Sequence, residues 1–267
     1  VCVKRDLFGL IAARAFLGAL GAPWPEVTVF CSTRTRPAET DHRLPLLLKA
    51  LERDIPIDTL LAATAAERRA LPAALRPEAW HPLPDLKPAG GAAALLGWRP
   101  DMIVSMRFSL IFPPAVIAAV PGGILNLHPG PLPGYRGLFA PFWQVLAGEA
   151  DLVATLHLVD AGIDTGAVLA EHRVARRTGR SLLWHLGELS RGGAVLAARA
   201  VRRAERGIPP VGTAQPPGGR YHRIPGAEAA DAFLAGSMPV VATPDYLALL
   251  AEALSPALPG DAMAAAS

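Results

Sequence analysis

Short apolar runs alternate with longer stretches of helical periodicity along most of this chain, and this alternation constrains the fold more than any other feature. The runs at residues 102–105 (MIVS) and 124–127 (ILNL) are almost continuously apolar, which is typical of strands buried on both faces. Strands that alternate with helices favour a mostly parallel sheet, because each helix returns the chain to the start of the next strand. We therefore predict an α/β fold with a doubly wound, mostly parallel, Rossmann-like sheet.

The same patterns predict where the individual elements lie. Strands are expected at residues 1–3, 27–31, 102–105, 124–128, 153–159 and 167–174. Helices are expected at residues 6–20, 43–53, 59–71, 91–96, 114–120, 140–147 and 181–206, with helical fragments at 231–234 and 246–254. Residues 215–223 are rich in glycine and proline and are expected to form a hairpin.

Composition and charge argue against several classes of protein. The 267 residues are 51% hydrophobic, enough for a substantial core, and the net charge of +3 is too small to indicate a nucleic-acid partner. We interpret the many arginines at residues 173–206 as a solvated basic helix face. Cys2 and Cys31 lack the spacing of a disulfide framework or a metal site. A reducing compartment is the simpler interpretation, and we expect a cytoplasmic protein without a secretory leader.

One apolar segment, residues 108–127, is long enough to span a bilayer. It contains Pro113, Pro114 and Pro121, which break a continuous helix more than once. We therefore predict a loop, a short helix, a turn and a buried strand, and expect no association with a membrane.

Three polar residues form the candidate site. Asn126 and His128 lie two apart on an expected strand, so their side chains share a face, and Asp164 follows in the loop DAGIDTG. Ligands of open α/β sheets bind at the carboxyl ends of the strands, where these residues fall. An amide can hold a developing oxyanion, and an imidazole and a carboxylate can move protons, so the set can support acyl transfer to an amine. Because a nearby carboxylate raises an imidazole pKa, we expect His128 to be a cation that shares the oxyanion with Asn126.

Each residue also has a structural interpretation when it is taken alone. A single histidine at a strand end is usually a hydrogen-bonded structural residue, and an asparagine such as Asn126 can form a turn. The segment around Asp164 could be an ordinary turn or part of a calcium loop, but the further acidic ligands of such a loop are missing. The three residues together favour a catalytic site without a metal.

The residues around these three resemble the folate-dependent formyltransferase family. The family pattern N-x-H-P…LP-x-Y-R-G, followed by H-x(6)-D-x-G, corresponds here to residues 126–129, 132–137 and 157–166. The resemblance is specific over residues 100–174. It implies that N10-formyltetrahydrofolate is the formyl donor and that Asn126, His128 and Asp164 are catalytic, with His157 supporting the Asp164 carboxylate.

The resemblance also implies two sets of binding residues. Those expected to hold the folate are Phe108, Leu110, Ile111, Asp160, Ala161, Gly162 and Ile163. Those expected to border the acceptor are Pro129, Gly130, Tyr135 and Arg136. We assign residues 1–180 to a formyltransferase catalytic core and residues 181–267 to a C-terminal helix with a small helical and hairpin appendage.

The acceptor is expected to be the amine of a small metabolite: an amino sugar, an amino acid or hydroxylamino acid, or an intermediate of specialised metabolism. The methionyl-tRNA branch of the family opens with a G-T-P-type turn and the purine-pathway branch with a Gly/Ser/Asn-rich turn, whereas residues 4–9 here are KRDLFG. The alternatives are a formyltetrahydrofolate hydrolase, a non-catalytic folate-binding relative, and a dinucleotide-binding protein, which would need a G-x-G-x-x-G turn. A homodimer is compatible with the sequence, which does not determine the oligomeric state.

Overall fold

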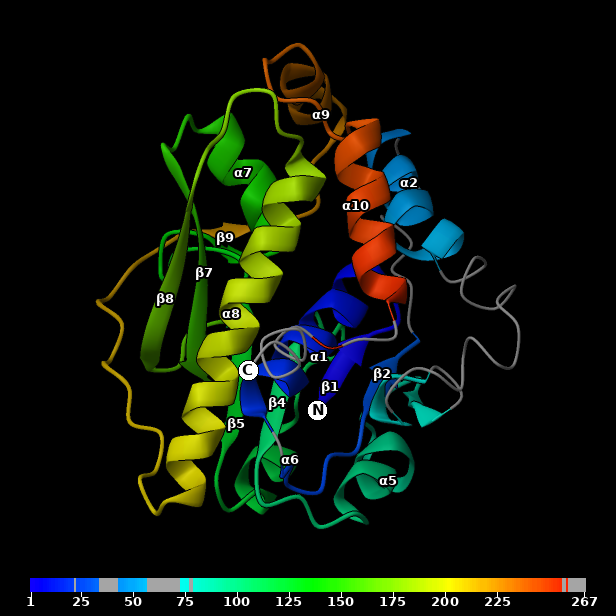
Figure 1. Cartoon of the computed structure of the whole chain (residues 1–267). Coiled ribbons are helices and arrows are strands. Elements are labelled where there is room, and N and C mark those ends of the chain that lie inside the picture. The colour runs from blue at the N-terminus through cyan, green and yellow to red at the C-terminus, as the bar shows by residue number, and fades with distance from the viewer. Residues whose placement is uncertain (22, 34–42, 57–72, 77–78, 256–257, 259–267) are drawn as a thin grey trace.

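A single sheet organises the computed structural model, which describes residues 1–21, 23–33, 43–56, 73–76, 79–255 and 258. Within these residues seven strands pair in the order β3–β2–β1–β4–β5–β7–β8 (Figure 1). Their bounds are β1 (Cys2–Lys4), β2 (Phe30–Ser32), β3 (His81–Leu83), β4 (Ile103–Met106), β5 (Ile124–His128), β7 (Asp151–Leu158) and β8 (Val168–Ala175). The strands from β3 to β5 are parallel, whereas β7 is antiparallel to β5 and β8 is antiparallel to β7. This mostly parallel sheet confirms the predicted fold class.

Helices lie between the strands and after them. Their bounds are α1 (Leu7–Leu20), α2 (Arg43–Lys49), α5 (Ala93–Leu96), α6 (Pro114–Ala119), α7 (Ala140–Leu146), α8 (Leu182–Glu205), α9 (Ala227–Leu234) and α10 (Thr243–Leu254). Shorter helical turns occur at Ala50–Asp54, Ala73–Leu75 and Pro88–Ala92. Two short strands, β6 (Arg136–Gly137) and β9 (Tyr221–His222), form a separate parallel pair.

Alternate residues of the central strands enter two apolar cores. Val104 of β4 and Leu125 of β5 pack into the larger core together with α1 and α8, which lie side by side over the sheet (Figure 1). Their neighbours Ile103 and Ile124 pack into the smaller core with α5 and α6. Because successive side chains of a strand point to opposite faces, helices cover both faces of the sheet.

Two glycines let α8 lie close to the strands that support the site. A Cβ atom on Gly193 would lie 2.4 Å from Cδ1 of Leu127, and one on Gly192 would lie 2.1 Å from Nε2 of His172. The helix continues through both positions, since its packing against the sheet compensates for the low helix propensity of glycine.

All six expected strands are present, each within three residues of its predicted start. The expected helices are also present, except that residues 59–71 lie outside the described part of the chain. The strand β3 was not predicted, because it has only three residues and Pro82 stands at its centre. A proline is tolerated there because β3 forms an edge of the sheet among the described strands.

The hairpin expected at residues 215–223 is wrong. Residues of this segment pair instead with the loop after β5, where the N–H of Arg136 donates to the carbonyl of Arg220 at 3.0 Å and that of Leu138 to the carbonyl of His222 at 2.9 Å. The partner lies far away in the sequence, and local glycine and proline content cannot reveal such a pairing.

Two arginines of α8 are not simply solvated. Arg191 forms an ion pair with Glu252 of α10. Arg202 donates to the carbonyl oxygens of Leu20 at 2.7 Å and Gly21 at 2.5 Å, at the C-terminal end of α1. The basic face expected at residues 173–206 therefore includes contacts that hold helices together.

The two cysteines, Cys2 and Cys31, are buried free thiols on adjacent strands. In the described part of the chain, no helix has both the length and the apolar character needed to cross a membrane.

Candidate active site

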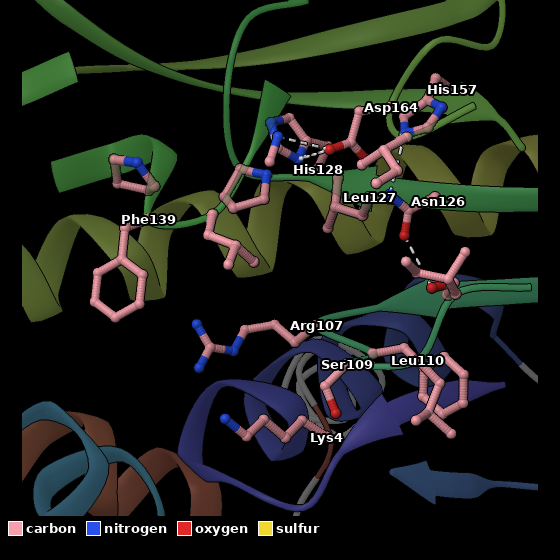
Figure 2. Close-up of a pocket in the computed structure, with 18 of the residues that line it drawn as sticks. Lys4, Arg107, Ser109, Leu110, Asn126, Leu127, His128, Phe139, His157 and Asp164 are labelled. Atoms are coloured by element: carbon pink, nitrogen blue, oxygen red, sulfur yellow. Dashed lines mark hydrogen bonds and ion pairs between the residues drawn. The ribbon is translucent and has the colours of Figure 1, made fainter. Parts of the chain in front are cut away.

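The three candidate catalytic side chains meet in a cavity of about 290 Å³. Asn126 and His128 come from β5 and Asp164 from the loop between β7 and β8, and Figure 2 shows them grouped with His157. Lys4 and Arg107 lie on the facing side of the same cavity (Figure 2). Small-molecule sites usually enclose roughly 300–1,000 Å³, so the cavity lies near the lower end of that range.

The sheet register fixes the orientation of Asn126. It stands beside Ser105 of β4 and opposite His157 of β7. The Ser105 hydroxyl donates to Oδ1 of Asn126 at 2.8 Å, and Nδ2 of Asn126 lies 3.0 Å from Nε2 of His157. His157 donates from Nδ1 to the carbonyl of Leu158 at 2.7 Å, so its Nε2 can accept from the amide. Because an amide nitrogen carries two N–H groups, the second one can bind a ligand oxygen.

The imidazole of His128 is almost completely buried and has a polar neighbour at each nitrogen. Nε2 donates to the carbonyl oxygen of Tyr135 at 2.6 Å, which places a hydrogen on that nitrogen. Nδ1 faces Oδ2 of Asp164 at 3.5 Å, longer than an ordinary hydrogen bond. Nδ1 can therefore be the basic, unprotonated nitrogen of a neutral ring.

The expectation of a cationic His128 is wrong, because the pKa of this residue is lowered and not raised. Burial lowers the pKa of His128 below its usual value, and the opposing effects of Asp164 and the Tyr135 carbonyl do not overcome it. The nearby carboxylate raises the pKa of the imidazole, but the loss of hydration around a ring that is 3% exposed lowers it by more. The resting imidazole is accordingly neutral at pH 7.

Asp164 is a buried carboxylate with several stabilising neighbours. Burial alone would raise its pKa, but His128, His157 and the N–H of Gly137 together lower the pKa of Asp164 to about 2. The Gly137 N–H donates to Oδ2 at 2.8 Å, and Nε2 of His157 lies 3.6 Å from Oδ1. The backbone of Asp164 has φ = 54°, a left-handed conformation that is uncommon outside glycine. The surrounding contacts thus hold a charged group in a strained position.

The loop at residues 129–137 packs tightly behind His128. The carbonyl oxygens of Pro129 and Gly130 accept hydrogen bonds from Gln144 at 3.1 Å and from Thr155 at 2.7 Å. A Cβ atom on Gly130 would lie 2.7 Å from Cβ of Ala140 and 2.9 Å from Nε2 of His128. Glycine is therefore the residue that fits behind the imidazole.

The side chains of the expected acceptor loop face different surroundings. Pro129 lines the cavity. The Tyr135 hydroxyl donates to Glu149 at 2.6 Å, and its ring stacks on His222 with centroids 5.2 Å apart. Arg136 donates to Gln215 at 3.1 Å. Tyr135 thus contributes its backbone carbonyl to the site, through His128, while its ring packs against β9.

Most of the residues expected to hold the folate lie on the cavity wall. Those that line it are Phe108, Leu110, Ile111, Asp160, Gly162 and Ile163, whereas Ala161 is not among the lining residues. Ile111 and Ile163 are 65% and 43% exposed, which leaves apolar surface available to a ligand.

Hydrogen bonds within the loop after β7 hold its conformation. Asp160 accepts hydrogen bonds from the N–H of Gly162 at 3.1 Å and the hydroxyl of Thr165 at 2.6 Å. Among the residues that the structure describes, no group of histidine, cysteine and acidic side chains is arranged to hold a metal ion. Through its two hydrogen bonds, Asp160 stabilises the turn that precedes Asp164.

Sequence reasoning missed a charged cluster on the facing wall of the cavity. Arg107, at the end of β4, forms ion pairs with Asp6 at 2.8 Å and Glu52 at 2.5 Å. Asp6 also caps α1 by accepting from the N–H of Gly9 at 2.8 Å. Burial raises the pKa of Glu52 although Arg107 opposes it. The three charged residues come from three separate segments, and no local pattern marks them as partners.

The segment that carries the site is similar to known proteins. Residues 51–178 match the family model described as formyl transferase. Methionyl-tRNA formyltransferase of Paramagnetospirillum magneticum is 34% identical over 131 residues, which cover 49% of this chain and 43% of that protein. GDP-perosamine N-formyltransferase of Brucella melitensis biotype 1 is 37% identical over 76 residues, which cover 28% of this chain and 29% of that protein. The matches thus span less than half the length of these two relatives.

A solved structure shows the same fold. A 4-N formyltransferase from Francisella tularensis aligns with a TM-score of 0.56 and 16% identity, covering 87% of this chain and 85% of that one. Asn126, His128 and Asp164 all fall within the region of the family match. The resemblance inferred from the sequence is confirmed, because residues 51–178, which carry the site, match the formyl transferase family.

Proposed function

We propose that this chain transfers a formyl group from N10-formyltetrahydrofolate to the amine of a small metabolite. The observation that carries the proposal is the convergence of Asn126, His128 and Asp164 in one cavity. These groups supply an oxyanion donor, a neutral base and a fixed anion, which are the needs of acyl transfer to an amine.

Asn126 is proposed to stabilise the tetrahedral intermediate. The amine lone pair forms a bond to the formyl carbon, and the carbonyl π pair moves onto oxygen. One Nδ2 hydrogen of Asn126 points to His157, and the other donates to this oxyanion. When the intermediate collapses, the C=O bond forms again and the bond to N10 of the folate breaks.

His128 is proposed to carry the proton from the amine to N10. Its Nδ1 takes the proton that the amine loses, since Nε2 already holds the hydrogen bound to Tyr135. The Asp164 carboxylate, 3.5 Å away, stabilises the imidazolium, which then protonates the departing N10. Asp164 keeps its charge throughout, in agreement with the lowered pKa of its carboxyl group.

The folate is proposed to lie against the apolar wall formed by Ile111 and Ile163. Both side chains expose apolar surface at the cavity, and Leu110 lines the same wall. The backbone of Asp160, Gly162 and Ile163, which also line the cavity, offers polar groups. A flat bicyclic ring with polar edges suits such a combination of apolar walls and a few polar contacts.

A small polar amine is the acceptor that we favour. Two relatives are named for GDP-perosamine and for methionyl-tRNA, so similarity does not choose between a sugar and a tRNA. The wall facing His128 is lined by Lys4, Glu52 and Arg107. Charged side chains within a cavity of this size are suited to a small polar molecule.

The decisive experiment combines purified protein, N10-formyltetrahydrofolate and a panel of amines. Tetrahydrofolate release and the mass of each amine would be followed for the wild type, Asp164→Asn and Asp151→Asn. Asparagine tolerates the left-handed backbone of residue 164, so this variant removes the charge and should retain the fold. Asp151 is exposed at the start of β7 and provides a matched control.

We expect one amine to gain the mass of one formyl group with the wild type and Asp151→Asn. Asp164→Asn should reduce this rate by roughly 100-fold or more. Folate deformylation without a formylated amine would favour the hydrolase. Folate binding without turnover of any amine would favour a non-catalytic relative, and absence of binding would refute the folate assignment.

A further inference from the structure

The segment after α8 connects the loop that carries Asp164 with the loop that follows His128. It runs along the β8 edge of the sheet and returns to β9 (Figure 1). Thr213 pairs through its backbone with Val168, just after the Asp164 loop, with both N–H···O distances at 2.8 Å. Further along, β9 pairs with β6 in the loop that follows His128.

Gln215 lies between these two pairings and bonds to both loops. Its Nε2 donates to the carbonyl oxygens of Asp164 at 3.0 Å and Gly166 at 2.8 Å. Its Oε1 accepts from Nη2 of Arg136 at 3.1 Å. The amide thus uses both of its hydrogens and its oxygen on the two loops.

These bonds link the two loops on either side of the Asp164 carboxylate. Gly137, which follows Arg136, donates its N–H to Oδ2 of Asp164 at 2.8 Å. Gln215 binds the backbone of the same aspartate, whose left-handed φ of 54° requires support from its surroundings. Gly137 therefore holds the carboxylate of Asp164, and Gln215 holds the backbone of the same residue.

We propose that Gln215 is a positioning residue that holds the Asp164 loop against the 129–137 loop and so sets the separation between the Asp164 carboxylate and His128. Its effect on catalysis rests on the proposed formyl transfer. Its effect on the separation of Asp164 and His128 does not depend on that proposal, so the effect on catalysis and the effect on geometry can be tested separately.

The first test measures the titration of His128 by NMR of its imidazole, assigned with His128→Gln. Asp164 opposes the burial that lowers the pKa of His128, and His157 is the other titratable group that acts on it. Gln215→Met keeps the side-chain length and removes the hydrogen bonds. If Asp164 then moves away, the pKa of His128 falls further, and we expect its midpoint at lower pH than in the wild type.

Thr213→Ala is the matched control, because its exposed side chain is lost while the backbone pairing with Val168 remains. Its His128 midpoint should equal that of the wild type. In the formyl-transfer assay, Gln215→Met should lower kcat on the order of 10-fold or more and leave the KM for the folate nearly unchanged. A loss of stability alone would not separate kcat from KM in this way.

An unchanged His128 midpoint in folded Gln215→Met would overturn the proposal. If the wild type transfers no formyl group, the proposed function fails, but the titration still decides the role of Gln215. Gln215→Ala, which leaves more space, serves as the second variant. If both variants fail to fold while Thr213→Ala folds, Gln215 contributes only to stability and the positioning role is refuted.

Discussion

Nδ1 of His128 lies 3.5 Å from Oδ2 of Asp164, and one loop holds both groups in place. The carbonyl of Tyr135 accepts from Nε2 of His128, and the N–H of Gly137 donates to the same Asp164 oxygen. Both backbone groups belong to the loop at residues 129–137. Their spacing fixes the imidazole and the carboxylate relative to each other without a direct hydrogen bond, which leaves Nδ1 able to take a proton.

The rate of formyl transfer should depend on a neutral His128. Burial lowers the pKa of His128 below 6.5, so the basic form dominates above that pH. With amine and folate saturating, we expect kcat to be constant above pH 6.5 and to fall as the pH drops through the lowered pKa of His128. Asp164 adds no inflection between pH 5 and 8, because its pKa of about 2 keeps it charged. The measurement is a profile of kcat against pH, and a kcat that rises on acidification would instead indicate a cationic His128 as the active form.

Gly130→Ala should damage both stability and activity. The new Cβ atom would meet Ala140 at 2.7 Å and Nε2 of His128 at 2.9 Å, so the imidazole has to move. We expect the free energy of unfolding to fall by about 1–3 kcal/mol and kcat to fall with it. Gly134→Ala is the control, because its Cβ would meet only Pro131 at 3.8 Å. Urea denaturation and the transfer assay on both variants check the prediction, and equal behaviour of the two would contradict it.

Ser105→Ala should weaken the oxyanion donor without removing it. The Ser105 hydroxyl donates to Oδ1 of Asn126 and so keeps Nδ2 on the His157 side. If this hydrogen bond contributes about 1 kcal/mol to holding the Asn126 amide in place, its loss corresponds to a fall in kcat of roughly 5-fold. Ser105→Thr retains a hydroxyl and should keep more activity than Ser105→Ala. If the alanine variant were as fast as the wild type, another group would have to orient the amide.

Arg107→Met should destabilise the fold, because it leaves two carboxylates of low exposure without their cation. Asp6 is completely buried and the Glu52 side chain is 13% exposed. We expect the free energy of unfolding at pH 7 to fall by about 2 kcal/mol or more. This value is smaller than for a fully buried ion pair, because solvent screens the partly exposed Arg107 side chain. Burial already raises the pKa of Glu52, so acidification neutralises this carboxylate at a higher pH than an ordinary glutamate, and the deficit should shrink as the pH falls.

The control for this variant is Arg173→Met, whose ion pair with Glu171 is largely exposed. Its unfolding free energy should change by less than about 1 kcal/mol. Denaturation curves at pH 7 and pH 5 for both variants provide the comparison. A deficit of equal size at the two pH values would show that packing, and not the unpaired carboxylates, explains the loss.

Local patterns predicted six of the seven strands described in the sheet, and burial on both faces leaves an almost continuous apolar run in β4 and β5. They also identified Asn126 and His128 as neighbours on one face of β5, since side chains alternate along a strand. The family motif added Asp164 from the next loop. For these features the relevant contacts lie within one element or between elements close together in the chain.

Interactions between distant segments were not predictable in the same way. β9 pairs with β6 and not with its own neighbours, and Gln215 bonds to Asp164 and Arg136 from a segment that was expected to be a hairpin. The ion pairs of Arg107 join β4 to residues before α1 and after α2. No periodicity records such contacts, because each partner satisfies only the local preferences of its own segment.

The charge of His128 shows most clearly the difference between what local sequence patterns predict and what contacts between distant segments decide. The sequence identified the imidazole and its carboxylate partner, and a Coulomb argument from these two groups alone predicts a raised pKa. Only the folded chain surrounds the ring with β5, β7 and the 129–137 loop, and the resulting loss of hydration outweighs the attraction of Asp164. Residue types and spacing thus determined which groups meet, whereas the packing of distant segments decided the protonation state in which they meet.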